Sequence, residues 1–255
     1  MDINKVLYIA LEAGRIILQN GGETYRVEET IYRICSSYGI NNAESFVTPT
    51  GIIVSVIDKY GDTNSLVKRV KSRSVNLEKV SKVNDLARNI RNEGLTCEEV
   101  KERLEKIDND KRYSLNTTIF FSALSSSLFT LLFGGSFSDS LVAFFIGAII
   151  KYTCNLLAQN KLNDFFTNII GGAIAAFLAN LSVYCSLGTN SDMITIGSIM
   201  LLVPGLAITN AIRDTLAGDL LAALSRGLEA ILTAVAIALG TGLALKIWFV
   251  YIGGI

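Results

Sequence analysis

Hydrophobic residues follow two different patterns along the chain, and the pattern changes at about residue 112. Before this point apolar residues recur at helical spacing, as at Val27, Ile31 and Ile34. This spacing places them on one face of an amphipathic helix. After it the chain has long apolar runs, beginning with residues 113–138, which carry no charge at all. The two patterns predict two domains in different surroundings.

The first domain, residues 1–112, is predicted to be a small cytoplasmic α+β domain. Its three strand segments are rich in β-branched residues and form a meander with a turn at 58–62, and Thr96 and Glu99 have the spacing of a capping box that starts a helix. We expect helices at about 3–17, 27–34, 76–92 and 96–108, and strands at about 45–47, 52–57 and 63–70.

The second domain, residues 113–255, is predicted to be an α-helical membrane domain of five transmembrane helices. It has only 5 basic and 6 acidic residues, against 18 and 17 in residues 1–112, which is too few for a wetted surface. Its apolar runs have the length that crosses a bilayer, about 20 residues. A wholly soluble protein is therefore excluded. We expect the spans at about 115–133, 140–158, 165–185, 193–212 and 226–248.

Basic residues predict the orientation of these spans in a plasma (inner) membrane. Lys111 and Arg112 precede the first span, Lys161 lies between the second and third, and Arg213 and Arg226 lie between the fourth and fifth. The other two loops have no Lys or Arg. Because cytoplasmic loops are enriched in these residues, the amino terminus is expected in the cytoplasm and, with five spans, the carboxyl terminus outside.

Composition excludes several classes of function. The chain has no histidine, and its four cysteines are scattered, which argues against metal, haem and histidine-dependent catalytic sites. A net charge of zero argues against nucleic acid as a partner. No Gly-Lys-Ser/Thr phosphate loop is present, so this chain has no ATP site of that type. We therefore assign no catalytic residue, metal or cofactor.

Polar and helix-breaking residues inside the spans are candidates for a substrate or ion pathway. Lys151 and Asn155 lie one turn apart in the second span, where a charge costs on the order of 3 kcal/mol at the bilayer centre. Pro204 and Gly205 lie halfway along the fourth span, and a broken helix there would free backbone groups for a ligand. The alternatives are a lysine that reaches the interface to anchor its helix and an ordinary proline kink.

Charged residues after the fourth span extend this candidate pathway. On a continuous helix Asp219, Arg226 and Glu229 would fall within about 80 degrees of one another. Without histidine, a proton-coupled step would have to use carboxylates such as those of Asp214, Asp219 or Glu229. The alternative is a solvated loop with an ion pair between Arg226 and Glu229.

A second polar group lies in the first domain. Glu23, Arg26 and Glu28 precede the turn that contains Thr48 and Thr50. They could form a polar pocket that gates the cytoplasmic mouth, or a hydrolytic site with paired carboxylates. Hydrolysis is disfavoured because neither histidine nor a metal cluster is evident. The alternative is a solvated helix face.

Together these motifs resemble the threonine/serine exporter family over nearly the whole chain. They are the segment Gly22–Glu28, the turn Thr48–Gly51, and Pro204-Gly205 followed by Asn210, Asp214, Asp219, Arg226 and Glu229. The family's fused members have about ten spans, so this chain resembles the larger, amino-terminal subunit of the split form. The resemblance implies export of threonine, serine or small organic acids such as dicarboxylates, driven by an ion gradient. It also implies a partner, a second small multi-span membrane subunit of the same family.

One alternative function stays open at this point. The spans could serve only as a tether in the bilayer for a cytoplasmic enzyme or regulator. A tether needs neither an intramembrane lysine nor a broken span, so Lys151 and Pro204 favour transport.

Overall fold

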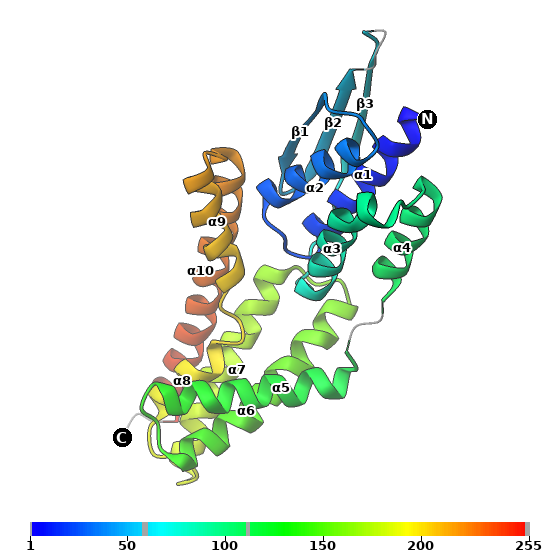
Figure 1. Ribbon diagram of the computed structural model, residues 1–255. Coiled ribbons are helices and arrows are strands. Elements are labelled where there is room, and N and C mark those ends of the chain that lie inside the picture. The colour runs from blue at the N-terminus through cyan, green and yellow to red at the C-terminus, as the bar shows by residue number, and fades with distance from the viewer. Residues whose placement is uncertain (1, 58–60, 111–112, 253–255) are drawn as a thin grey trace. The chain divides into compact units, whose positions relative to one another are not determined.

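The structure, a computed structural model, describes residues 2–57, 61–110 and 113–252 and divides into two compact units (Figure 1). The amino-terminal unit combines the chain up to Lys111 with the segment Leu206–Gly227. The membrane unit combines Arg112–Gly205 with the segment from Leu228 onward. Residues from the predicted fourth and fifth spans therefore belong to the same compact unit as the amino-terminal part.

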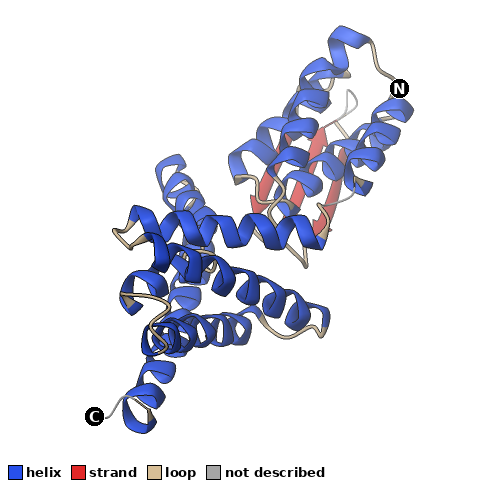
Figure 2. Cartoon of the chain, turned by 90° about the horizontal axis from the view of Figure 1, so that it is seen from below, coloured by secondary structure: helices blue, strands red, loops and turns tan. Residues whose placement is uncertain are grey.

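The amino-terminal unit contains a three-stranded antiparallel sheet in the order β1-β2-β3, in which Phe46 pairs with Ile53 and Ile53 with Val67. α1 and α2 pack against this sheet (Figure 2). The elements are α1 (Ile3–Gln19), α2 (Thr24–Ser37), β1 (Ala43–Thr48), β2 (Gly51–Ile57), β3 (Thr63–Arg69), α3 (Leu77–Glu93), α4 (Cys97–Asn109), α9 (Gly205–Ala217) and the start of α10 (Leu220–Tyr251).

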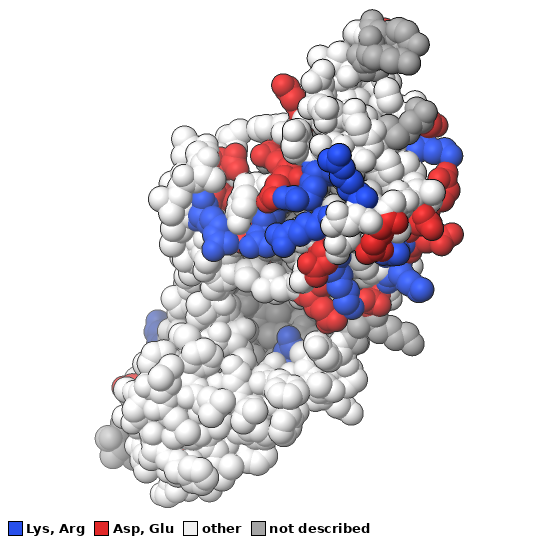
Figure 3. Space-filling view, viewed as in Figure 1, with Lys and Arg blue, Asp and Glu red and all other residues white. Residues whose placement is uncertain are grey.

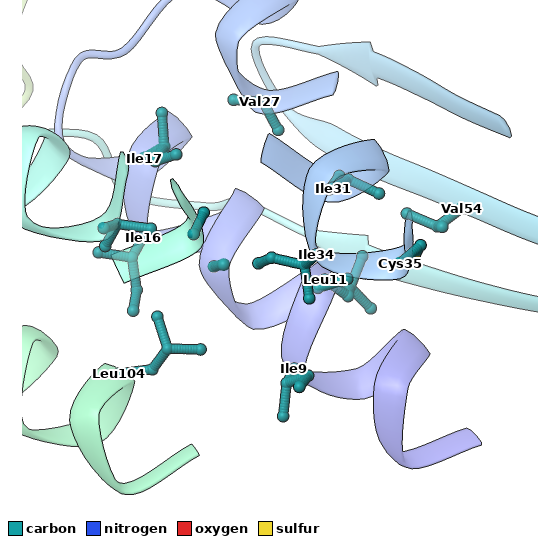
Figure 4. Close-up of a cluster of buried hydrophobic side chains, with 14 of the residues drawn as sticks. Ile9, Leu11, Ile16, Ile17, Val27, Ile31, Ile34, Cys35, Val54 and Leu104 are labelled. Carbon is teal, nitrogen blue, oxygen red and sulfur yellow. The ribbon is translucent and has the colours of Figure 1, made fainter. Parts of the chain in front are cut away.

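Large aliphatic side chains form the core of this unit. Leu11 of α1, Ile31 of α2, Val54 of β2 and Leu104 of α4 belong to one buried cluster (Figure 4). The predicted capping box at the start of α4 is confirmed, because the Thr96 side chain and backbone bond with Glu99 in both directions. α1 to α4 and the three strands lie close to where the apolar spacing places them.

The membrane unit buries small side chains and exposes large ones, the opposite of the amino-terminal unit. Its elements are α5 (Leu115–Leu132), α6 (Phe137–Gln159), α7 (Asp164–Tyr184), α8 (Ser191–Ile199) and the rest of α10. Small residues such as Ala123, Ala143 and Ala175 are fully buried, whereas Phe121 and Phe145 are exposed. Small residues let helices approach closely, and outward-facing aromatic rings suit a lipid environment.

The predicted fold class is wrong in two respects. Four described helices, α5, α6, α7 and α10, are long and apolar enough to cross a membrane, rather than five. The structure is also mainly helical with one small sheet, and not an α+β domain followed by five spans. The assignment of the two chain ends to opposite sides of the membrane depended on five spans and loses that basis.

The predicted fourth span accounts for the difference. It consists of the 9-residue α8 and of α9, which from Leu206 onward belongs to the amino-terminal unit. The helix is interrupted just before Pro204, whose ring removes a backbone donor and clashes with the preceding turn. Lys111, Arg112 and residues 58–60 of the predicted turn lie outside the described residues.

Close packing in the membrane unit can be tested at two glycines of α10. A Cβ at Gly240 would overlap the backbone oxygen of Ile169 in α7, whereas a Cβ at Gly242 would meet nothing within 4 Å. Gly240→Ala should lower the stability of the purified protein by about 1–3 kcal/mol, the usual cost of overpacking. Gly242→Ala should be neutral or slightly stabilising, because alanine favours a helix. Equal melting temperatures in detergent for the two variants would contradict this packing.

Candidate functional site

A buried polar cluster lies within the amino-terminal unit, where the start of α2 meets α9 and the start of α10. The Thr24 hydroxyl oxygen lies 2.8 Å from Asp214 Oδ1 and 3.1 Å from Asp219 Oδ2. Thr24 and Asp214 are fully buried, and Arg226 is 5% exposed. We call Thr24, Asp214, Asp219 and Arg226 the Thr24 cluster.

Asp214 and Arg226 form a buried ion pair, with 3.2 Å between Arg226 Nε and Asp214 Oδ2. Arg226 Nη2 also donates to the backbone oxygen of Gly22 at 2.9 Å. Gly22 has little room for a side chain, because a Cβ there would overlap Ile17. Removing two charges from water costs several kcal/mol per ion, so such a pair persists only with good geometry and further hydrogen bonds.

Two local features of the sequence bring these groups together. Asn210 and Asp214 are four residues apart and so lie on one face of α9, and Asn210 donates to the Gly21 oxygen at 3.1 Å. Gly218 has φ of +89°, a left-handed conformation that glycine adopts without strain. This turn separates α9 from α10, and Arg226 of α10 lies beside Asp214 of α9.

Glu23 lies at the edge of the Thr24 cluster and pairs with two solvent-exposed arginines. Its carboxylate pairs with Arg26 at 3.0 Å and with Arg213 of α9. Arg26 and Arg213 are both well exposed, so each pair contributes at most about 1 kcal/mol. The two pairs nevertheless give Glu23 contacts with both α2 and α9.

Glu28 lies on α2 near the cluster. Its Oε1 accepts a hydrogen bond from the Val47 amide at 3.2 Å. Burial and, secondarily, the negative charge of Asp219 raise its pKa above the usual 4.5. The negative charge of Asp219 therefore disfavours ionisation of Glu28.

The turn residues Thr48 and Thr50 have a different place. The Thr48 hydroxyl donates to the Gly51 oxygen at 3.3 Å, and the Thr50 oxygen accepts from the Val70 amide. Within the described residues neither bonds to the Thr24 cluster. The structure thus places them in the β1–β2 hairpin and its junction with β3.

Other predicted pathway residues belong to the membrane unit. Lys151 and Asn155 are partly buried on α6, and neither forms a hydrogen bond or ion pair within the described part of the chain. Glu229 is exposed on α10. Asp219 immediately precedes α10, and its backbone oxygen accepts from the Ala223 amide at 2.9 Å. Along this helix Arg226 is buried and Glu229 is exposed.

Two buried polar residues were not among the predicted site residues. Thr24 is central to the cluster, and its only signal in the sequence is its place between two proposed motif residues. Asp139 is fully buried in the membrane unit and accepts from the amides of Thr189 and Asn190 at 2.6 and 3.1 Å. It also completes a capping box with Ser136, whose three-residue spacing was the available signal.

The Thr24 cluster consists of a hydroxyl, two carboxylates and a guanidinium, groups that can bind polar ligands and exchange protons. No group of three or more metal-ligating residues occurs among the described residues.

A comparison with protein families matches residues 8–248 to the family described as "Putative threonine/serine exporter". The chain belongs to the threonine/serine exporter family.

Individual relatives of this family member differ in length and in the substrate they are named for. The "Probable succinate transporter subunit YjjP" of Escherichia coli is 26% identical over 95% of this chain and 94% of its own length. The "Threonine/serine exporter" of Corynebacterium glutamicum is 26% identical over 95% of this chain but 51% of its own length. The "Probable threonine/serine exporter" of Mycobacterium tuberculosis is 22% identical, with 96% and 47% covered. No solved structure matches the chain.

The raised pKa of Glu28 can be tested through the pH dependence of stability. A carboxyl whose folded-state pKa exceeds its unfolded value stabilises the fold below the unfolded pKa, and this contribution is lost as pH rises through the folded pKa. Glu28→Gln retains an oxygen that can accept from the Val47 amide but cannot ionise. Its melting temperature should therefore rise relative to the unsubstituted protein as pH increases from about 4 to 7.

Glu102→Gln, which removes the same charge from an exposed position on α4, serves as the control for net charge. A Glu28→Gln advantage that is largest at pH 4, or a net loss at neutral pH, would contradict the raised pKa.

Proposed function

We propose that this protein is one subunit of a secondary membrane transporter that exports small carboxylate-bearing molecules, either threonine and serine or dicarboxylates. The observation that carries the proposal is the Thr24 cluster, in which a buried cation, a buried carboxylate and a buried hydroxyl lie with the partly buried carboxylate of Asp219 in a member of an exporter family. All relatives above are named as transporters or exporters, which favours transport over the tethered-enzyme hypothesis.

Arg226 is the group best suited to a substrate carboxylate. It is buried, and a guanidinium offers a planar fork that matches a carboxylate. Asp214 occupies it in this structure. A substrate carboxylate would have to take the place of Asp214, and protonation of Asp214 would ease that exchange. Threonine, serine and dicarboxylates all carry a carboxylate, so this chemistry serves each candidate.

The number of hydrogen bonds that the Thr24 hydroxyl can donate favours the proton as the coupling ion. A hydroxyl has one proton to donate, yet Thr24 contacts oxygens of both Asp214 and Asp219. Both contacts are hydrogen bonds only if one carboxyl is itself protonated and donates to the hydroxyl. The cluster is thus suited to bind and release one proton.

A second membrane subunit completes this proposal. The exporters of C. glutamicum and M. tuberculosis are about twice as long as the region they share with this chain, and the E. coli relative is named a subunit. Glu229, exposed on a helix long and apolar enough to span the bilayer, offers a partner a charged contact. We place the amino-terminal unit on the cytoplasmic side, because basic residues concentrate there.

Efflux from lipid vesicles tests both substrate and partner. Vesicles that contain this chain together with the small family member encoded in the same genome should release labelled threonine, serine or succinate when a pH gradient is imposed. Vesicles with either chain alone should not. Full efflux by this chain alone would contradict the two-subunit proposal, and no efflux of any of the three compounds from vesicles with both chains would contradict the proposed substrate class.

The role of the shared hydroxyl is tested by a matched pair of variants at Thr24. Thr24→Val keeps the shape but removes the hydroxyl, whereas Thr24→Ser keeps the hydroxyl. We expect Thr24→Val to lose about tenfold or more of the pH-driven efflux, as for a hydrogen bond to a charged group. Thr24→Ser should keep most of it. Equal pH-driven rates in the two variants, at equal expression, would show that the hydroxyl takes no part in proton coupling.

A further inference from the structure

A groove between α2 and α3 lies apart from the Thr24 cluster and has its own chemistry. It has a volume of about 340 Å³, and a smaller hollow of about 130 Å³ adjoins it. The lining of the groove includes small residues, namely Ser36 and Ser37 of α2 and the buried Ala87 of α3. We call these two connected hollows the α2–α3 groove.

Arginine dominates the charge of the α2–α3 groove. Its charged lining consists of four arginines, Arg26, Arg33, Arg88 and Arg91, against the single carboxylate of Glu29. No lysine lines it. Basic side chains gather on a face of the amino-terminal unit seen in Figure 3. Arginine rather than lysine is the residue that recognises planar or tetrahedral oxyanions through paired hydrogen bonds.

Two of these arginines have capacity for a ligand. Glu29 is engaged by Arg33 at 2.7 Å, and Arg26 pairs with Glu23. The side chains of Arg88 and Arg91 form no hydrogen bond or ion pair with any described residue. Their guanidinium groups therefore give the groove an uncompensated positive charge beside polar side chains.

We propose that the α2–α3 groove binds a small dianion, a dicarboxylate or a phosphate group, at Arg88 and Arg91 with Arg33. The volume admits a small metabolite, and the arginines supply enough donors for two anionic groups. This site is distinct from the proposed transport function, and the groove would bind its ligand whether or not the chain exports it.

The site is tested by titrating the purified full-length protein with inorganic phosphate, succinate and acetate in a calorimeter. Arg88→Gln with Arg91→Gln should weaken binding of a dianion about tenfold or more. Lys101→Gln with Lys106→Gln, which removes the same charge from exposed positions of α4, should change it less than about twofold. Phosphate binding without succinate binding identifies a phosphoryl ligand, and the reverse identifies a dicarboxylate.

Thr24→Val separates this site from the transport site, because it removes the shared hydroxyl of the Thr24 cluster, keeps the buried ion pair of Asp214 and Arg226, and should leave dianion binding in the groove unchanged. Hydrogen exchange should show dianion-dependent protection in α2 and α3. The proposal is overturned if the Arg88/Arg91 double variant binds both dianions as tightly as the unsubstituted protein, if acetate binds equally well, or if no dianion binds at millimolar concentration.

Discussion

The buried ion pair between Asp214 and Arg226 is the constraint on which the amino-terminal unit depends. A buried charge that loses its partner destabilises a protein by about 3–5 kcal/mol, so these residues must stay together when the chain folds. Asp214 Oδ1 also accepts from the hydroxyl of Thr24, and Arg226 Nη2 donates to the oxygen of Gly22. Those groups are 190 and 204 positions away in the sequence. The segment 206–227 is consequently part of the amino-terminal unit rather than an independent loop.

The breaks in the helices follow from this constraint. A single uninterrupted span from Ser191 to Ala217 would keep Asn210 and Asp214 on a helix continuous with the membrane unit. Interruption at Pro204 separates α8 from α9, and the left-handed turn at Gly218 separates α9 from α10. Pro204 and Gly218 thus lie at the two ends of α9, which carries Asp214, whereas Asp219 and Arg226 follow the second break.

Local structure was largely predictable, and the partners of the charged residues were not. The spacing of apolar residues locates α1 to α4 and the strands, because the residues on a buried face recur with the period of the helix or strand. The same reasoning predicts α8 and α9 as one continuous span. Hydropathy averaged over a span-length window does not reveal that α8 has only 9 residues or that the helix is interrupted after it. Spacing also groups Asp219, Arg226 and Glu229 on one face, but it assumes a helix that only begins at Leu220.

The candidate site shows the same limit. Periodicity tells which face of α2 is buried, but not that Thr24 meets a carboxylate from α9. A resemblance at motif level names Asp214, Asp219 and Arg226 without saying which of them touch. Only the fold distinguishes these three from Lys151, which lies in the other unit without an ion pair in the described chain.

Protonation and geometry are physically linked in this arrangement. Thr24 belongs to α2, whereas its two acceptors belong to the segment from α9 to α10. With one carboxyl protonated, the hydroxyl both donates and accepts; with both ionised, it satisfies only one of them, and the nearby Glu28 adds a further negative charge. A ligand shifts a conformational equilibrium only by as much as it binds one state better. In the proposed function a proton on one of the two carboxyls would meet this condition, because the number of hydrogen bonds that join α2 to α9 and α10 would depend on its presence.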